Sequence, residues 1–234
     1  LAIGRVTVQL ATHRPFYPKY DPTATLTVAM GDIFSMNGSA IVGMAGKDSV
    51  AIATDLRYGN SYQTIGTNMR KVFRLSDNLM VALGGLATDI QTLSAKLRFR
   101  VNLYELEEKR PMSPKVATRM LSQLLYKHRF GPFFVSPIVA GLSKEGEPWV
   151  ASMDSIGAVS DVDAYYSEGT AAETLMGACE TYWKEDMTPE QLGGTVERVI
   201  QAGMGRDAFS GWGAEVWLLT SEGLEVREVK TRQD

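Results

Sequence analysis

Residues 39–55 read SAIVGMAGKDSVAIATD, and this stretch indicates the fold class. It divides into two apolar segments, SAIVGMAG and DSVAIATD, which meet at a tight Gly-Lys turn. In the second segment Val50, Ile52 and Thr54 lie on one side and alanines on the other, which is the period of a β-strand. Two such segments joined by a short turn predict an antiparallel β-hairpin.

The same hairpin pattern recurs along the chain. Further strand pairs are predicted at 71–75 with 78–85, 134–142 with 147–154, and 213–219 with 224–230. Between these pairs the apolar period changes to that of a helix, at 86–106, after Ser113, at 171–183 and after Thr188. Strand blocks joined by hairpins favour antiparallel sheets with segregated helices. We therefore expect an α+β fold, a four-layer αββα sandwich, forming one domain over residues 30–234.

The predicted helices have identifiable core faces and start signals. In the first, the core stripe is Ile90, Leu93, Leu97, Val101 and Tyr104. The second begins with Ser113 as N-cap and Pro114 at the first helical position, and its expected core residues are Val116, Met120, Leu121 and Leu124. Thr188 and Gln191 form a capping box that predicts the start of the last helix.

Composition excludes several classes of protein. The chain has 234 residues, 44% of them hydrophobic and 22% charged, which is typical of a globular domain. A net charge of −3 argues against a nucleic-acid binder, and no apolar run is long enough for a transmembrane helix. One cysteine, Cys179, and two histidines leave neither an intrachain disulfide nor a thiolate or imidazole metal cluster, so no metal is expected.

Residues 1–29 differ from the rest of the chain. They contain Arg5, Arg14 and Lys19 but only one acidic residue, Asp21, and three prolines that prevent a long helix. A mitochondrial transit peptide fits this charge balance, but the prolines count against its amphipathic helix. We expect an extended arm that lies on a protein surface, and the surface of another subunit would suit it.

Chemistry by an N-terminal hydroxyl nucleophile requires a Thr, Ser or Cys freed by cleavage, its own α-amine as base, a cation and an oxyanion donor. Ser39, in MNGS, would become such a residue if the Gly38–Ser39 bond were cut. The segments VAIATDLR, RKVF, ALGGLATD and GRDAFSGWG follow it. Together they resemble the beta subunits of the 20S proteasome over residues 30–234, which implies the N-terminal nucleophile hydrolase fold.

The resemblance implies a set of site residues. With Ser39 at the position of the family's N-terminal threonine, the family's buried aspartate, tuning lysine and oxyanion glycine fall in register without a gap. Asp55 lies 16 residues after Ser39, Lys71 lies 32 after it and Gly85 lies 46 after it. Two further residues, Asp207 and Ser210, match the family's D-x-x-S-G pair.

Other segments narrow the resemblance to one branch. Five segments resemble the type 3 beta subunits, which do not cleave peptides. These segments are MNGS, LATD, FRVNLYELEEKR, YKHRFGPFFVSPIVAG and TRQD. The resemblance implies a structural subunit supporting ATP- and ubiquitin-dependent protein degradation in the cytoplasm and nucleus. The implied partners are the other alpha and beta subunits of a 28-subunit assembly, with type 2 and type 4 beta subunits as ring neighbours. No cofactor is implied.

The resemblance also implies a role for Asp154 and Ser155, which lie in the segment SMDSIG. Family members of this branch line part of the substrate pocket of the neighbouring type 2 subunit, which prefers cleavage after basic residues. A carboxylate at Asp154 would favour a cationic substrate side chain there.

A serine at position 39 leaves a second interpretation open, an active N-terminal serine hydrolase formed by autolysis at Gly38–Ser39. Against it, the nitrogen of an uncut Ser39 is an amide, whereas a free α-amine has a pKa of about 7.7–8. Glu168 also stands near the place where active members have a serine, and its carboxylate would crowd the site. Asp55 and Lys71 are equally explained as a buried pair that fixes the first hairpin. We therefore expect no catalysis, and we rank a monomeric binding module third.

Overall fold

The hairpin at residues 39–55 forms the centre of the first sheet. β1 (Ala40–Ala45) and β2 (Ser49–Asp55) pair antiparallel, with Ile41 opposite Thr54. The computed structural model describes residues 29–233, and the side chains of residues 33–233, and in it this sheet has the strand order β10-β1-β2-β11-β12. Its other strands are β10 (Tyr165–Gly169), β11 (Ala214–Thr220) and β12 (Gly223–Val229).

A second five-stranded antiparallel sheet has the order β5-β6-β7-β8-β9. Its strands are β5 (Val72–Ser76), β6 (Leu79–Gly85), β7 (Val135–Leu142), β8 (Pro148–Met153) and β9 (Val159–Ser160). The two sheets pack face to face through a buried apolar layer that includes Ile41, Ile52, Met80 and Ile138. The strand pairs predicted from sequence are confirmed.

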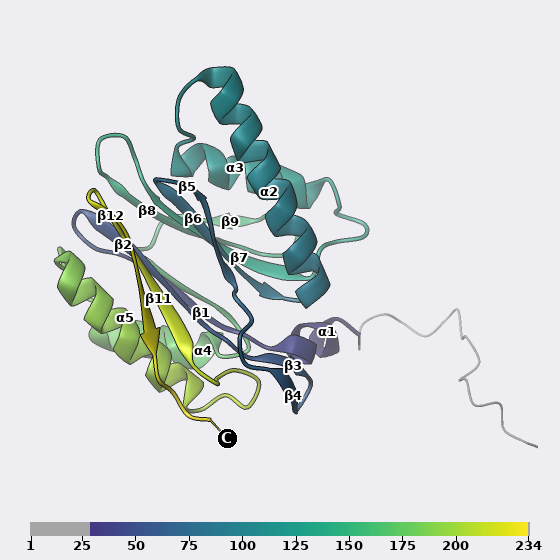
Figure 1. The fold of residues 1–234 in the computed structure, drawn as a ribbon. Helices are drawn as coiled ribbons and strands as arrows, with labels where there is room; N and C mark the ends of the chain where they lie inside the picture. The colour runs from purple at the N-terminus through teal and green to yellow at the C-terminus, as the bar shows by residue number, and fades with distance from the viewer. Residues whose placement is uncertain (1–28, 234) are drawn as a thin grey trace, which may run out of the picture.

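Helices cover the two outer faces, as Figure 1 shows. On the first sheet lie α4 (Ala172–Tyr182) and α5 (Pro189–Met204), and on the second lie α2 (Ala87–Glu108) and α3 (Pro114–Tyr126). The side chains of β2 follow this layering, because Val50 and Ile52 face the other sheet while Ala51 and Ala53 face α4 and α5. The α+β, four-layer αββα architecture is confirmed. None of the described helices is both long and apolar enough to cross a membrane.

The predicted helix starts are confirmed, and one predicted core residue is wrong. Ser113 Oγ accepts a hydrogen bond from the Val116 N–H, and Thr188 and Gln191 form the reciprocal capping box. Val116 is 39% exposed and does not face the core. The buried stripe of α3 begins one residue later, at Ala117, and continues through the predicted residues Leu121 and Leu124 and through Leu125. One residue is about 100° around a helix, which turns Val116 towards solvent.

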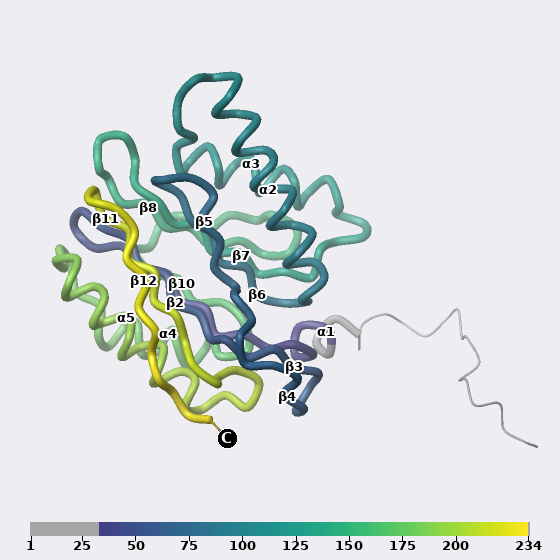
Figure 2. Tube along the Cα trace, viewed as in Figure 1, coloured from purple at the N-terminus to yellow at the C-terminus, as the bar shows by residue number. Residues whose placement is uncertain are grey.

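Some short pieces of structure were not expected from the sequence. They are α1 (Ala29–Asn37), the small hairpin of β3 (Tyr58–Asn60) and β4 (Gln63–Gly66), and the separate strands β9 and β10. α1 contacts β3 and the end of β6, and Figure 2 shows α1 and the small hairpin beside the sandwich. The predicted arm at residues 1–29 lies outside the described residues except for Ala29, and it stays a prediction.

Candidate functional site

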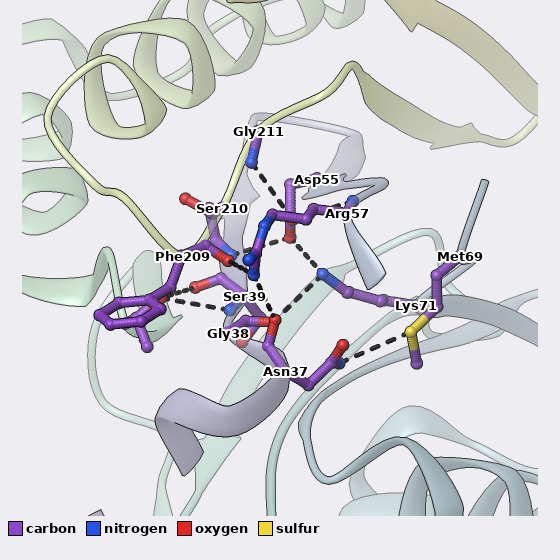
Figure 3. A network of polar contacts seen from close by, with 12 residues as sticks. Asn37, Gly38, Ser39, Asp55, Arg57, Met69, Lys71, Phe209, Ser210 and Gly211 are labelled. Atoms are coloured by element: carbon purple, nitrogen blue, oxygen red, sulfur yellow. Dashed lines mark hydrogen bonds and ion pairs between the residues drawn. The ribbon is translucent and has the colours of Figure 1, made fainter. Parts of the chain in front are cut away.

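The expected site residues gather where β1 begins and β2 and β6 end, together with the loop after α5. Two pairs are in direct contact: Lys71 Nζ lies 2.7 Å from Asp55 Oδ1, and Ser210 Oγ lies 2.7 Å from Asp207 Oδ2. The antiparallel pairing of β1 and β2 places the end of one strand beside the start of the other. The chain therefore assembles this site from segments far apart in sequence (Figure 3).

Asp55 is fully buried and accepts hydrogen bonds on both carboxylate oxygens. Oδ1 accepts from Lys71 Nζ and from the Ala40 N–H at 3.0 Å, and Oδ2 accepts from the N–H groups of Arg57 and Gly211 at 3.2 and 3.4 Å. Four donors offset the cost of burying this charge. Asp55 thereby connects the start of β1, the end of β2 and the loop after α5.

Lys71 is also fully buried, and its ammonium donates to two acceptors. One is Asp55 Oδ1, and the other is the Gly38 carbonyl oxygen, 3.3 Å away. Burial lowers the pKa of Lys71, and the Asp55 carboxylate opposes that shift. In the described part of the chain, Lys71 donates no hydrogen bond to the Ser39 hydroxyl. It binds the carbonyl oxygen of the residue before Ser39 instead.

Arg57 is a second buried cation, with 1% of its surface exposed, and it also binds the segment before Ser39. Its guanidinium donates to the carbonyl oxygens of Asn37, Phe209 and Ser61 and to Thr64 Oγ1, at 2.6–3.0 Å. The Asn37 side chain adds three contacts, with the Gly59 N–H, the Gly85 carbonyl and Met69 Sδ. Figure 3 shows Arg57 and Lys71 directed towards residues 37–39.

Gly38 fits a place that other residues would not. Its φ of +70° lies in the left-handed region, and an added Cβ would overlap the Phe209 carbonyl oxygen. The amide N–H of the next residue, Ser39, donates to Thr170 Oγ1 at 3.2 Å. Thr170 donates in turn to Asp207 Oδ2 at 2.7 Å. A nitrogen that donates as a peptide N–H cannot serve as a general base.

Ser39 and Gly85 line a small hollow of about 240 Å³. Ser39 is 2% exposed, and its Oγ packs closely against Gly84 and Gly169, where an added Cβ would clash with it. Glu168 lines the same hollow, as the sequence predicted. Burial raises the pKa of Glu168 to about 7, against the effect of hydrogen bonds from Ser152 and Ser136. Ser39 and the carboxyl-bearing residue Glu168 therefore line the same hollow.

Asp154 and Ser155 directly follow β8, and the charge of Asp154 contributes to the raised pKa of Glu168. Asp154 is exposed, and its Oδ1 accepts from the N–H groups of Ile156 and Ala158 at 3.0 and 2.8 Å. One carboxylate oxygen thus fixes the loop between β8 and β9. This placement leaves the predicted contact with a neighbour's pocket as a prediction.

Sequence reasoning missed Arg57, Asn37 and Thr170 as members of the site. Arg57 stood within the quoted segment VAIATDLR and Asn37 directly preceded the Gly-Ser step, so both were visible but had no assigned role. Cys179 lies in the core between α4 and the first sheet. Within the described residues, no three His, Cys, Asp or Glu side chains are grouped so that they could hold a metal ion.

Comparison with known proteins adds independent findings. The family model described as "Proteasome subunit" matches residues 35–219. The chain is similar to "Proteasome subunit beta type-3" of Drosophila melanogaster, with 47% identity over 86% of this chain and 99% of the relative. It is 45% identical to the proteins of the same name from Picea mariana and Oryza sativa subsp. japonica, over the same shares. The resemblance seen in the sequence motifs is confirmed.

Proposed function

The chain belongs to the proteasome subunit family, and from that premise we propose that it is a non-catalytic, architectural subunit of the core beta ring. One observation supports this most directly. The two cations that could activate a hydroxyl, Lys71 and Arg57, both bind carbonyl oxygens of the segment before Ser39. The polar groups thus stabilise an uncut chain. Glu168 gives further support, because it lines the same hollow as Ser39 and its ionised carboxylate would disfavour a developing oxyanion in that hollow.

The proposal includes a place in the assembly. Membership of the family indicates assembly with other proteasome subunits. We propose in addition that this chain stands between type 2 and type 4 beta subunits in a 28-subunit particle of the cytoplasm and nucleus. In that place it would contribute to ATP- and ubiquitin-dependent protein degradation without cutting peptides itself.

The intact mass of this chain, taken from the purified and then denatured assembly, tests the proposal. We expect a mass that includes Gly38 and the residues before it. A Ser39→Ala chain is the matched control, and it should differ from the parent by one oxygen atom and leave all peptidase activities of the particle unchanged. A parent mass that begins at Ser39, with a longer Ser39→Ala chain, would show autolysis and overturn the proposal.

The second candidate is an active N-terminal serine hydrolase. The observation that favours it is the retained geometry, in which Asp55 and Lys71 are paired and Gly85 lines the same hollow as Ser39. It requires a free amine at Ser39, so the same mass measurement decides between the two candidates.

A further inference from the structure

The hollow of about 240 Å³ near the end of β10 contains a carboxyl group without a counter-ion. Glu168 is half-buried there, and over residues 33–233 it forms no ion pair. The neighbouring strands offer it hydroxyl groups, from Ser136 on β7 and Ser152 on β8. The charge that acts on it is Asp154, which has the same sign. An ionised Glu168 therefore lacks a positive partner, and a ligand can supply one.

The Ser39 hydroxyl is a second polar group that lacks a partner in the same hollow. Ser39 is 2% exposed and forms its hydrogen bonds through the backbone, since its N–H donates to Thr170 Oγ1 and its carbonyl oxygen accepts from the Ala171 N–H. Its Oγ has no hydrogen-bond partner among the described residues. The described side-chain oxygens that are both unpaired and fully enclosed are those of Ser49 and Thr54. The Ser39 Oγ therefore keeps access to the hollow, where it can bind a donor.

The lining of the hollow disfavours anions and metal ions. Among the described residues that line it there is no Lys, Arg or His, and Glu168 is the one carboxylate. A divalent cation takes six or more oxygen ligands, several of them carboxylates. Phe34 of α1 adds an apolar wall, and its ring lies edge-on to Phe134 with the centroids 6.1 Å apart. One carboxylate, free hydroxyl groups and an apolar wall suit an ammonium group on a short alkyl chain.

We propose that this hollow binds a primary alkylammonium ion, with Glu168 and Ser39 as the side chains that hold its head group. The three N–H groups donate to the Glu168 carboxylate, to Ser39 Oγ and to Ser136 Oγ, and the alkyl chain lies along Phe34. A non-hydrogen atom needs about the 30 Å³ of a water molecule, so butylammonium needs about 150 Å³ and fits the hollow. The inference goes beyond the proposed function, because binding such an ion requires neither catalysis nor a particular place in an assembly.

Photolabelling of the full-length chain, purified in its assembly, tests this binding. The probe is butylamine that carries a diazirine, and peptide mass spectrometry locates the label. At pH 8 we expect label in the segments around Ser39 and Glu168. At pH 6 the half-saturating concentration should be about tenfold higher, because Glu168, with a pKa of about 7, is then mostly protonated while the amine stays charged.

Substitutions separate the head-group contacts from general effects on the fold. Glu168→Gln should raise the half-saturating concentration at pH 8 at least tenfold and remove its dependence on pH, and Ser39→Ala should raise it about fivefold. Glu145→Gln, at an exposed loop position, should change neither value. Label confined to other segments, or equal labelling of Glu168→Gln and the parent, would overturn the inference.

Competition identifies the source of the head group. Unlabelled butylamine should displace the probe, whereas butanol, which has the same chain without the charge, should not. A lysine blocked at both ends carries the same ammonium group. If it also displaces the probe, the site accepts lysine side chains of peptides, and if it does not, the site is specific for free alkylamines. Displacement by butanol, or none by butylamine, would show that the hollow does not recognise the ammonium group and would reject the proposal.

Discussion

Asp55 and Lys71 form a buried pair whose partners depend on one another. Neither side chain is exposed to solvent, and Lys71 Nζ lies 2.7 Å from Asp55 Oδ1. We expect Lys71→Met and Asp55→Asn each to lower the free energy of unfolding by about 3 kcal/mol, because each leaves the partner's charge buried. The double variant should cost clearly less than the sum.

Denaturant unfolding of the purified chain measures this coupling. The exposed Arg74–Asp77 pair is the control, and Arg74→Met should change stability by less than about 0.5 kcal/mol. Strictly additive effects of Lys71→Met and Asp55→Asn would show that the buried pair has no special role.

Glu168 gives the stability of the chain a dependence on pH. Burial raises its pKa from 4.5 to about 7, so the folded chain holds this proton more tightly than the unfolded chain does. The resulting stability is fully present below about pH 4.5 and is lost as the pH rises through about 7. Glu168→Gln does not titrate, and at pH 8 we expect it to be more stable than the parent by about 2–3 kcal/mol.

Urea unfolding at several pH values between 4.5 and 8 checks this expectation. The two chains should converge in stability near pH 4.5 and diverge as the pH rises. Glu145→Gln, at an exposed loop position, should show no such divergence. A constant difference between Glu168→Gln and the parent at all pH values would assign the effect to packing instead of titration.

The predictable part of the site is the part defined by spacing along the chain. Spacing and family resemblance together placed Ser39, Asp55, Lys71 and Gly85, because each lies at the end of a strand or directly before one. Arg57 could not be assigned in this way, since three of its four hydrogen bonds go to backbone carbonyl oxygens. Carbonyl positions depend on the three-dimensional path of the chain and leave no mark on residue type.

At the scale of elements, the start of α5 depends on its capping box. Thr188 Oγ1 accepts from the Gln191 N–H, and the Gln191 side chain accepts from the Thr188 N–H. We expect Thr188→Ala to lower the free energy of unfolding by about 1 kcal/mol. Thr181→Ala, at an exposed position in α4, is the control and should stay within about 0.5 kcal/mol in the same thermal unfolding experiment. Equal effects of the two changes would contradict a capping role.

The elements that were predictable are those with a long apolar period. The main hairpins and the four helices of the outer layers have such periods, and the structure contains them all. The pieces that were missed are short, such as β3 with three residues and β9 with two. In these pieces tertiary contacts decide the conformation, and few residues are available to show a pattern. Val116 was wrongly assigned to the core for a different reason. It is an apolar residue next to the buried stripe of α3, and residue type alone does not separate it from that stripe.

At the scale of the whole molecule, the fold separates two kinds of surface. The polar network around Asp55 lies inside, at one end of the strands, and stabilises the junction of α1, β1 and β2. The solvent-facing side of α2, with Phe99, Leu103 and Leu106, and the loop of Asp154 lie outside. The proposed non-catalytic subunit can still act through such surfaces, because contacts with neighbouring chains do not depend on a nucleophile. Effects of outside residues should therefore appear only in the assembled particle.

Asp154 is the residue for which that expectation is sharpest. An asparagine at 154 keeps an oxygen that can accept from the Ile156 and Ala158 N–H groups, so the loop should be preserved while the charge is lost. If this carboxylate attracts cationic substrate side chains at a neighbouring subunit, particles with Asp154→Asn should cleave after Arg and Lys about two- to fivefold less efficiently. Cleavage after apolar residues should stay unchanged.

Asp48→Asn removes an equivalent exposed charge from the turn between β1 and β2, and it should have no effect on either cleavage. Fluorogenic peptides that end in basic or apolar residues measure both rates on the same particles. An unchanged rate after basic residues would remove Asp154 from the neighbour's pocket and leave it as the residue that fixes its own loop.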